Sequence, residues 1–368
     1  MSFETFEKTL PQRDLWQYLS DCDKPVVMYG MGNGADKIIK QLDLISVEIK
    51  DFFASDEFVR GQSFHGKVVH KFEQIKEKYS DFIILVSFGS EREDVINKII
   101  SLDKEYELYL PDVPVAGDDL FNIEFYKNNR SRIKEAYEKF ADDESRRVFE
   151  DVIMYKLTGK INYLFKHTHS DVEVYKKLYD TELWHTCADL GAYDGDSVFT
   201  ILECAPDIEK IIAIEPDPKN FRKLVKNIQN VSVFVEAHNV CAYSEKTELA
   251  FDRGGNRNSS VSTIGHTPSV GDTKSIIINA DRLDNIVADR KVDFIKIDVE
   301  GCELEAIRGA YATIAKCRPD LLVSAYHKSE DLFELPLEIS SLVPAHKIYL
   351  RRKRCLPAWE ISLCAIKA

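Results

Sequence analysis

The chain has 368 residues, of which 44% are hydrophobic and 30% are charged, a composition typical of folded globular proteins. At roughly 150 residues per domain, this length favours about two domains. The formal charge of −13 argues against a surface built to coat nucleic acid or an anionic membrane.

The first residues, MSFETFEKTLPQRDLW, lack the basic start and apolar run of a secretory signal. No apolar run approaches the ~20 residues that a membrane helix needs. The eight cysteines are scattered without a CxxC pair, so we expect buried free thiols and neither a disulfide framework nor a zinc site. We therefore expect a cytoplasmic protein with no membrane span, no nucleic-acid partner and no bound metal. Whether it forms a homodimer is left open.

In the first 118 residues, short apolar runs alternate with stretches of helical spacing. The strand-like runs VVMYG, VEIKDFF and FIILVSFGS favour a parallel sheet covered by helices. Two prolines and a glycine in LPDVPVAGDD end the pattern. Residues 119–183 are polar, with apolar residues at three- and four-residue steps, which indicates helices. One of these helices is expected to begin near Arg146, capped by Ser145 and the acids before it.

Residues 184–368 show a cleaner alternation of seven strand-like runs with helices. The last two runs, KIYLRR and WEISLCAI, follow each other without a helix between them, and a glycine-rich, β-rich insertion lies near residues 247–279. The chain is therefore predicted to be an α/β protein. Its expected parts are a Rossmann-like domain over 1–118, a helical connector over 119–183 and a seven-stranded domain over 184–368.

The strongest motif is DLGAYDGDS, which begins at Asp189 and follows the first strand of the second domain. Its glycines allow a sharp turn and a close approach of the backbone to a ligand. Glu215 ends the next strand, where a carboxylate can accept hydrogen bonds from both hydroxyls of a ribose. Acids beside the glycines would repel a pyrophosphate, but they suit the ammonium and sulfonium groups of S-adenosylmethionine.

Two further strands end in groups that can carry chemistry. In KIDVEG, the two-residue period places Lys296, Asp298 and Glu300 on one face of a strand, so Lys296 is expected to neutralise a carboxylate inside the sheet. His327 ends the following strand, and its ordinary pKa makes it a usable base near neutral pH. His327 is the first candidate for a general base, and Asp298 or Glu300 is the second.

Two alternatives remain for these residues. The acids and Lys296 would also serve as a structural ion pair with a helix-capping acid. A Mg²⁺ ion bound by Asp298, Glu300 and His327 is a further option, because hard oxygen ligands suit that cation.

From about Asp142 onward, the chain resembles the FkbM family of S-adenosylmethionine-dependent methyltransferases. The matching segments are ADLGAYDGDS, AIEPDPKNFRKL, NVCAYSEKTELAF, GGNRNSSVS and FIKIDVEGCELEAIRGA. The resemblance implies a class I methyltransferase fold whose seven-stranded sheet has an antiparallel last strand. It also implies O-methylation of a hydroxyl, often on a sugar or polyketide, with S-adenosylhomocysteine as the product. Family members often carry an acid just before the histidine, where this chain has Tyr326.

The resemblance also implies roles for individual positions. The methionine part of the cofactor is assigned to Asp189, Gly191, Ala192, Tyr193, Asp194 and Gly195. The ribose is assigned to Glu215, the adenine to Pro216 and Asp217, and the border of the adenine to Asn239, Cys241 and Ala242. Asp298 is placed near the transferred methyl group. Candidate substrate contacts in the serine-bearing loop are Ser259 and Ser260.

The first domain contains a GxGxxA turn at residues 30–35, a pattern that is weak evidence by itself. The domain resembles the nucleotide-sugar-binding lobe of bacterial sugar acetyltransferases. That resemblance implies contacts to a phosphate or sugar from Gly32, Asn33, Gly34 and Ser87. The alternative is a degenerate lobe that only shapes the acceptor crevice or mediates dimerisation.

The basic run at residues 351–354, RRKR, lies between the last two strands and is expected to be a solvated hairpin tip. A site for an anionic acceptor, such as a nucleotide-linked sugar, is the alternative. Together the motifs predict an O-methyltransferase with a sugar or glycan-type acceptor. An NAD-dependent sugar-nucleotide oxidoreductase would need a YxxxK-type pair, and a non-catalytic sugar-nucleotide-binding protein would show damaged cofactor motifs. The cofactor motifs look intact, and Tyr155-Lys156 and Tyr175-Lys176 lack the YxxxK spacing.

Overall fold

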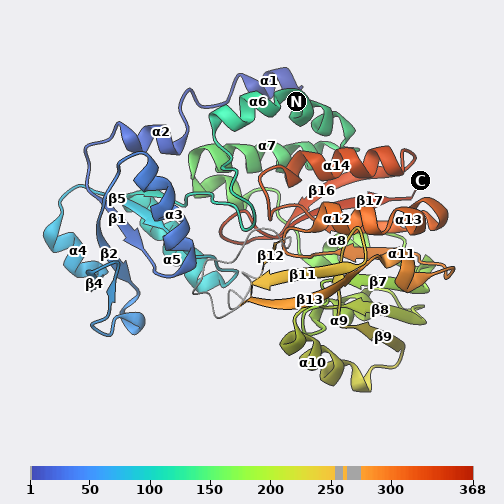
Figure 1. Ribbon diagram of the computed structural model, residues 1–368. Coiled ribbons are helices and arrows are strands. Elements are labelled where there is room, and N and C mark those ends of the chain that lie inside the picture. Colours follow the sequence, from blue (N-terminus) through green and yellow to red (C-terminus); the bar gives the residue numbers. More distant parts are fainter. Residues whose placement is uncertain (1, 253–259, 263–274, 368) are drawn as a thin grey trace.

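The computed structural model describes residues 2–252, 260–262 and 275–367, which form two α/β lobes joined by helices (Figure 1). The first lobe holds a six-stranded sheet in the order β3-β4-β2-β1-β5-β6. All of its pairings are parallel except the β3–β4 hairpin, which confirms the predicted parallel sheet. Its strands are β1 (Val26–Tyr29), β2 (Ile49–Ala54), β3 (Ser63–Phe64), β4 (Lys67–Lys71), β5 (Ile83–Val86) and β6 (Glu107–Tyr109).

Helices flank this sheet because its strands are apolar on both faces and need cover on both sides. They are α1 (Phe3–Glu7), α2 (Leu15–Ser20), α3 (Asn33–Leu44), α4 (Phe72–Lys78) and α5 (Glu93–Glu105), with the 3₁₀ turn η1 (Asp56–Phe58).

The connecting segment is helical and packs on the second lobe. Its helices are α6 (Ile123–Lys139), α7 (Asp143–Thr158) and α8 (Asp171–Leu178), with the 3₁₀ turns η2 (Ile161–Phe165) and η3 (Thr181–Leu183). Helix α6 lies beside α14, and α7 packs against β16 (Figure 1). The expected start of α7 near Arg146 is wrong, because Asp142 caps the helix by accepting the N–H of Ser145.

The second lobe contains a seven-stranded sheet in the order β16-β17-β15-β14-β7-β8-β9. Strand β17 runs antiparallel to both of its neighbours, which confirms the predicted last strand of a class I methyltransferase sheet. The strands are β7 (Thr186–Leu190), β8 (Lys210–Ile214), β9 (Phe234–His238), β14 (Phe294–Ile297), β15 (Asp320–Ser324), β16 (Lys347–Arg352) and β17 (Ile361–Ile366).

The β-rich insertion forms a separate sheet in the order β10-β13-β11-β12, as its sequence indicated. Its strands are β10 (Cys241–Ala242), β11 (Thr247–Asp252), β12 (Ser260–Ser262) and β13 (Ser275–Asp281). The helices of the second lobe are α9 (Asp196–Cys204), α10 (Pro218–Asn227), α11 (Leu283–Val287), α12 (Glu303–Gly309), α13 (Tyr311–Cys317) and α14 (Asp331–Leu342), with the 3₁₀ turn η4 (Ile228–Asn230).

The segment ELEAIRGAYATIAK forms two consecutive helices, α12 and α13. A Cβ atom on Gly309 would lie 2.0 Å from the carbonyl oxygen of Tyr243, so the chain passes too close there for a larger residue. Asp284 then caps α13 by accepting the N–H groups of Ala312 and Thr313. In contrast, α14 continues through Pro336.

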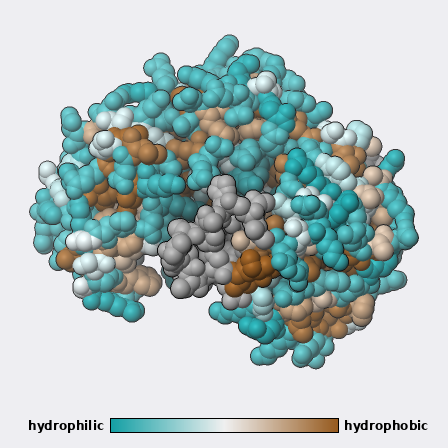
Figure 2. Space-filling view, viewed as in Figure 1, coloured by the Kyte–Doolittle hydropathy of each residue, from teal (hydrophilic) through white to brown (hydrophobic). Residues whose placement is uncertain are grey.

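The face of the molecule seen in Figure 2 is mainly hydrophilic, with hydrophobic side chains in separate patches. Within the part of the chain that the structure describes, no helix combines the length and apolarity needed to span a bilayer.

Candidate active site

A cavity of about 270 Å³ lies at the carboxyl ends of the central strands of the second sheet. Ligands bind at this edge in open α/β sheets. Its walls include residues at or just after the ends of β7, β8, β14 and β15, which are the strand ends that carry the candidate residues of the sequence. These residues include Gly191, Tyr193, Glu215, Pro216, Asp298, Glu300, Ser324 and Tyr326, with Cys241 and Ala242 of β10.

The glycine turn after β7 brings two strand ends close together. Gly191 has a φ of +85°, and a Cβ atom on it would lie only 1.8 Å from the carbonyl oxygen of Asp298. Gly195 has a φ of +97° and caps α9. The N–H groups of Gly191 and Ala192 both donate to the carbonyl oxygen of Ile214. The turn therefore has a fixed shape before any ligand binds.

Glu215 directly follows β8, beside this turn, and is buried. Its Oε2 accepts the N–H of Tyr193 and its Oε1 accepts the N–H of Asp217, each at 2.9 Å. Burial raises the pKa of Glu215 to about 8, although both backbone N–H groups favour the charged form. The side chain of Asn239 donates to the carbonyl oxygens of Glu215 and Pro216, so it holds this turn in place.

Lys296 forms the predicted ion pair inside the sheet. Its Nζ lies 3.2 Å from Oδ1 of Asp189 and 3.9 Å from Oδ2 of Asp298. Burial opposes its charge, but Asp189 and Asp298 outweigh burial and raise the pKa of Lys296. The Oγ of Ser197 donates to the other oxygen of Asp189. Asp189 is completely buried and is not among the cavity residues, so its observed contacts order the glycine turn.

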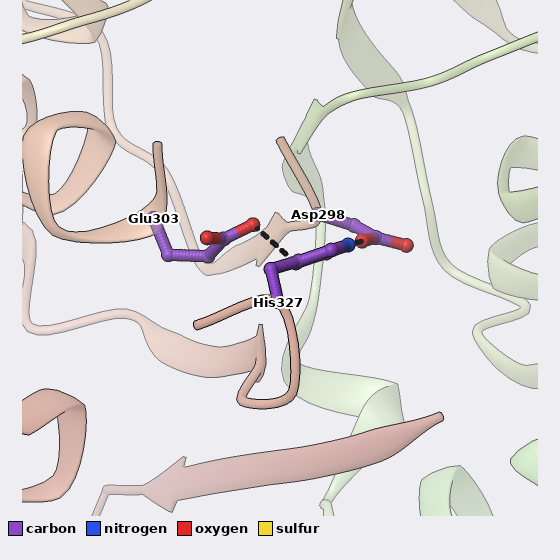
Figure 3. Close-up of side chains that lie close together, drawn as sticks. All are labelled: Asp298, Glu303 and His327. Atoms are coloured by element: carbon purple, nitrogen blue, oxygen red, sulfur yellow. Dashed lines mark ion pairs between the residues drawn. The ribbon is translucent and has the colours of Figure 1, made fainter. Parts of the chain in front are cut away.

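His327 lies at the centre of a group of acids (Figure 3). Its Nδ1 is 2.9 Å from Oε1 of Glu303, and its Nε2 is 3.4 Å from Oε2 of Glu300 and 3.7 Å from Oδ1 of Asp298. The side chain of His327 is 1% exposed and that of Glu303 is 0% exposed, whereas Asp298 and Glu300 are about one-third exposed and line the cavity. His327 therefore reaches the cavity only through these two carboxylates.

The charges of this group follow from its geometry. Burial disfavours the charged imidazolium, but Glu303, Glu300 and Asp298 together outweigh burial and raise the pKa of His327 well above its ordinary value. Burial raises the pKa of Glu300, against the lowering effect of His327. A protonated imidazole cannot accept a proton, so the carboxylates on the cavity side become the stronger candidates for a base.

Comparison with protein families shows that residues 189–348 match the model of the methyltransferase FkbM domain. The second lobe is an FkbM methyltransferase domain. A methyltransferase FkbM from Methylobacillus flagellatus KT has a similar structure over 98% of both chains, with a TM-score of 0.74 and 18% identity. The arrangement of both lobes is therefore shared with that protein, and at this identity the likeness establishes the fold alone.

Two other solved structures align with about half of the chain. They are Aeropyrum pernix fibrillarin with natively bound S-adenosyl-L-methionine (TM-score 0.32, 11% identity, 53% of this chain and 72% of that chain) and a precorrin-6y C5,15-methyltransferase from Geobacter metallireducens GS-15 (TM-score 0.31, 11% identity, 54% and 86%). These scores are too low to add to what the FkbM match shows. No curated protein matches the chain significantly.

Glu303 is the functional candidate of the FkbM domain that sequence reasoning missed. It occupies the first position of α12, and its Oε1 also accepts the N–H groups of Val299 and Gly301. The acid that lies against Nδ1 of His327 thus comes from another element and not from the residue before the histidine. The available signal was its place in the motif, three residues after Glu300 at the start of a helix.

Three side chains of the FkbM domain present donor atoms within 4.8 Å of one another and could hold a metal ion: Asp298, Glu303 and His327. The distances of 2.9 to 3.7 Å between His327 and its acids also fit an ion-pair cluster without a metal. That the site binds no metal stays a prediction, and the effect of a chelator on activity tests it directly.

The basic run is not a solvated hairpin tip. Arg351 and Arg352 belong to β16 and are buried. Arg351 pairs with Asp142 at 2.6 Å, and Nη2 of Arg352 donates to two backbone carbonyls of the connector. Lys353 alone of these four lines the cavity, whereas Arg354 pairs with Glu93.

The candidate sugar or phosphate contacts of the first lobe lie outside the cavity. A Cβ atom on Gly34 would lie 2.2 Å from the carbonyl oxygen of Ser87, so this glycine allows α3 to pack on the end of β5. The buried hydroxyl of Ser87 donates to the carbonyl oxygen of Tyr29. Gly32, with a φ of +100°, caps α3, which begins at Asn33. Ser259 lies outside the described residues, and Ser260 begins β12.

Proposed function

We propose that the protein transfers a methyl group from S-adenosylmethionine to a hydroxyl of a sugar or glycan-type acceptor. The observation that carries this proposal is the position of Glu215, a buried carboxylate at the cavity edge beside the Gly191 turn in an FkbM methyltransferase domain. Its oxygens keep lone pairs for ribose hydroxyls after accepting two backbone N–H groups.

The remaining cofactor contacts are proposed from the resemblance to FkbM methyltransferases, and they are supported where Gly191, Tyr193, Pro216, Cys241 and Ala242 line the cavity. The turn from Gly191 to Gly195, which includes Asp194, would hold the methionine part. Pro216 and Asp217 would lie beside the adenine, bordered by Cys241 and Ala242. An acidic cavity stabilises the positive sulfonium that makes the methyl group transferable.

The reaction is a direct displacement in which the acceptor oxygen forms a bond to the methyl carbon as the carbon–sulfur bond breaks. The electron pair of that bond goes to sulfur. Alignment of oxygen, carbon and sulfur supplies several kcal/mol through proximity. The hydroxyl proton goes to a carboxylate of the cavity, and Glu300 suits this role because it lines the cavity and its pKa is raised.

His327 then acts as a positioning residue for the two cavity carboxylates. It is fixed from behind by Glu303, and its positive charge faces Glu300 and Asp298. This assignment replaces the expectation that His327 is itself the first base, because its raised pKa keeps it protonated near neutral pH.

The eight cysteines are all free thiols. Free thiols fit a reducing compartment, and we propose the cytoplasm as the location.

Parallel calorimetric titrations with S-adenosylhomocysteine, NAD and UDP-glucose test the cofactor assignment. The proposal requires binding of S-adenosylhomocysteine at one site, and this binding should be about tenfold weaker or more in Glu215→Gln. Binding of NAD without S-adenosylhomocysteine would overturn it in favour of an oxidoreductase. Methyl transfer that persists unchanged with a chelator would exclude a required metal.

A further inference from the structure

The carboxyl ends of the six-stranded sheet of the first lobe and of the seven-stranded sheet of the second lobe face each other across the cavity. Glu91 lies in the loop after β5 and Val115 in the loop after β6, and both line the cavity formed by the FkbM domain. The first lobe therefore supplies part of one wall. Figure 1 shows the two sheets on opposite sides of the molecule, with their loops meeting between them.

The first contact between the lobes fixes an aromatic ring. Ser90 and Leu356 exchange backbone hydrogen bonds of 2.8 and 3.0 Å. A Cβ atom on Gly89 would lie 2.5 Å from the ring of Trp359 and 2.8 Å from the carbonyl oxygen of Leu356. The indole of Trp359 thus packs directly on the backbone of the first lobe, and Trp359 also lines the cavity.

The second contact fixes the loop after β6. Lys37 on α3 donates to the carbonyl oxygens of Pro114 and Val115, at 2.9 and 2.7 Å. The next residue, Ala116, donates its N–H to the carbonyl oxygen of His327 at 2.9 Å. The loop is therefore held by the first lobe on one side and by the His327 loop on the other, which gives the wall a defined position.

Among the described residues that line this cavity, acidic side chains far outnumber basic ones. Its acids are Glu91, Asp171, Asp196, Glu215, Asp298, Glu300 and Glu360, and its basic residues are Lys296 and Lys353. Lys353 lies 3.2 Å from both Glu91 and Asp171, so these two carboxylates already balance its charge. A phosphate or pyrophosphate would enter a negative field with no cation available to it among these residues.

We propose that the two lobes together form an acceptor subsite for an uncharged or amino-bearing glycoside, and that nucleotide-linked sugars are excluded. The ring of Trp359 offers an apolar face for a pyranose, and the carboxylates of Glu91 and Glu360 accept hydrogen bonds from hydroxyls or an ammonium. This subsite rests on the proposed function for the methyl donor that faces it. It gives the first lobe a role as a wall of the acceptor site.

Fluorescence titration tests the subsite, because Trp359 lines the cavity whereas Trp16 and Trp184 are buried elsewhere. The probes are methyl α-glucoside, methyl α-glucosaminide and UDP-glucose, each with and without S-adenosylhomocysteine. A glycoside is expected to change the emission, and the change should vanish in Trp359→Phe. Glu91→Gln should weaken glycoside binding about tenfold or more, because a hydrogen bond to a charged group is lost.

Glu93→Gln is the matched control, since Glu93 lies two residues away and pairs with Arg354 outside the cavity. It should leave glycoside binding unchanged. Tighter binding of UDP-glucose than of the glycosides, equal effects of the two variants, or no glycoside binding near the solubility limit would each overturn the subsite. Loss of S-adenosylhomocysteine binding would instead overturn the proposed function, and the titrations without it judge the subsite separately.

Discussion

Nδ1 of His327 lies 2.9 Å from Oε1 of Glu303, and both side chains are almost completely buried. The same oxygen accepts two backbone N–H groups from the loop after β14. The carboxylate therefore holds the ring in one orientation, with Nε2 directed toward the cavity carboxylates (Figure 3). This relationship joins the β14 loop, α12 and the β15 loop in one charged cluster.

Removing the buried carboxylate should destabilise the protein. Glu303→Gln leaves the imidazolium of His327 without its nearest counter-charge, and breaking a buried pair costs about 3–5 kcal/mol. Glu305→Gln in the same helix breaks an exposed pair with Arg308 and should cost no more than about 1 kcal/mol. Urea unfolding measures both losses. Equal losses would show that the pair with His327 contributes little.

Glu300 should control turnover without controlling cofactor binding. Glu300→Gln removes the proposed proton acceptor and should lower turnover of a bound methyl glycoside by about 10²–10⁴-fold. The rate of the unmodified enzyme should fall as the pH drops through the raised pKa of Glu300, because a protonated carboxyl cannot take a proton. The affinity for S-adenosylhomocysteine should not change. Normal turnover in this variant would show that Glu300 is not the general base.

His327→Ala should keep cofactor affinity and lower turnover by about 10²-fold. The charge of His327 lowers the pKa of Glu300, so its removal should raise that pKa further. The acidic limb of the pH–rate profile should therefore move to higher pH. A merely structural role would reduce the rate without moving the limb, and near-normal turnover would contradict any role.

Cofactor binding should be linked to the ionisation of Glu215. In the free protein this carboxyl has a pKa of about 8, and ribose hydroxyls that donate to it favour the carboxylate. Below pH 8, binding of S-adenosylhomocysteine should release a proton, and affinity should rise with pH and level off above that value. Calorimetry in buffers of different ionisation enthalpy measures this proton.

Glu215→Gln should abolish the proton release and weaken binding about tenfold or more. The matched control is Glu209→Gln, because Glu209 is exposed at the other end of β8. Proton release that survives in Glu215→Gln would assign the linkage to another group.

Gly191 and Gly195, the two glycines of the turn, should differ in how well they tolerate substitution by alanine. Both have positive φ, so alanine at either position costs ~1–2 kcal/mol of backbone strain. A Cβ atom at Gly191 would also meet the carbonyl oxygen of Asp298 at 1.8 Å, whereas at Gly195 the nearest atom is Cδ1 of Leu224 at 3.2 Å. Gly191→Ala should therefore reduce stability and cofactor affinity well beyond Gly195→Ala. Similar effects would contradict the tight turn.

The parts of the site that follow chain order were predictable from sequence. Glu215 and the glycine turn each come directly after an apolar strand, so parallel pairing alone places them at one edge. An acidic partner for Lys296 was also predictable. The two-residue period of the strand places Lys296 inside the sheet, and a buried charge is costly unless it is paired.

The parts that depend on distant elements were not. Glu303 meets His327 only because the fold brings the first residue of α12 against the loop after β15, and no local sequence pattern encodes this contact. Arg351 and Arg352 had the composition of an exposed turn, yet β16 extends through them and Asp142, far away in sequence, offsets the charge of Arg351. The cavity wall formed by Glu91 and Trp359 also could not be predicted, because it depends on how the two lobes pack against each other.

The most direct measurement follows methyl-labelled S-adenosylmethionine incubated with the enzyme and methyl α-glucoside. A sugar O-methyltransferase should place the label on the glycoside as a methyl ether, which resists mild alkali, and Glu300→Gln should slow this transfer. Label in an alkali-labile ester or on nitrogen, or no transfer to any glycoside while S-adenosylhomocysteine still binds, would contradict O-methylation of a sugar hydroxyl.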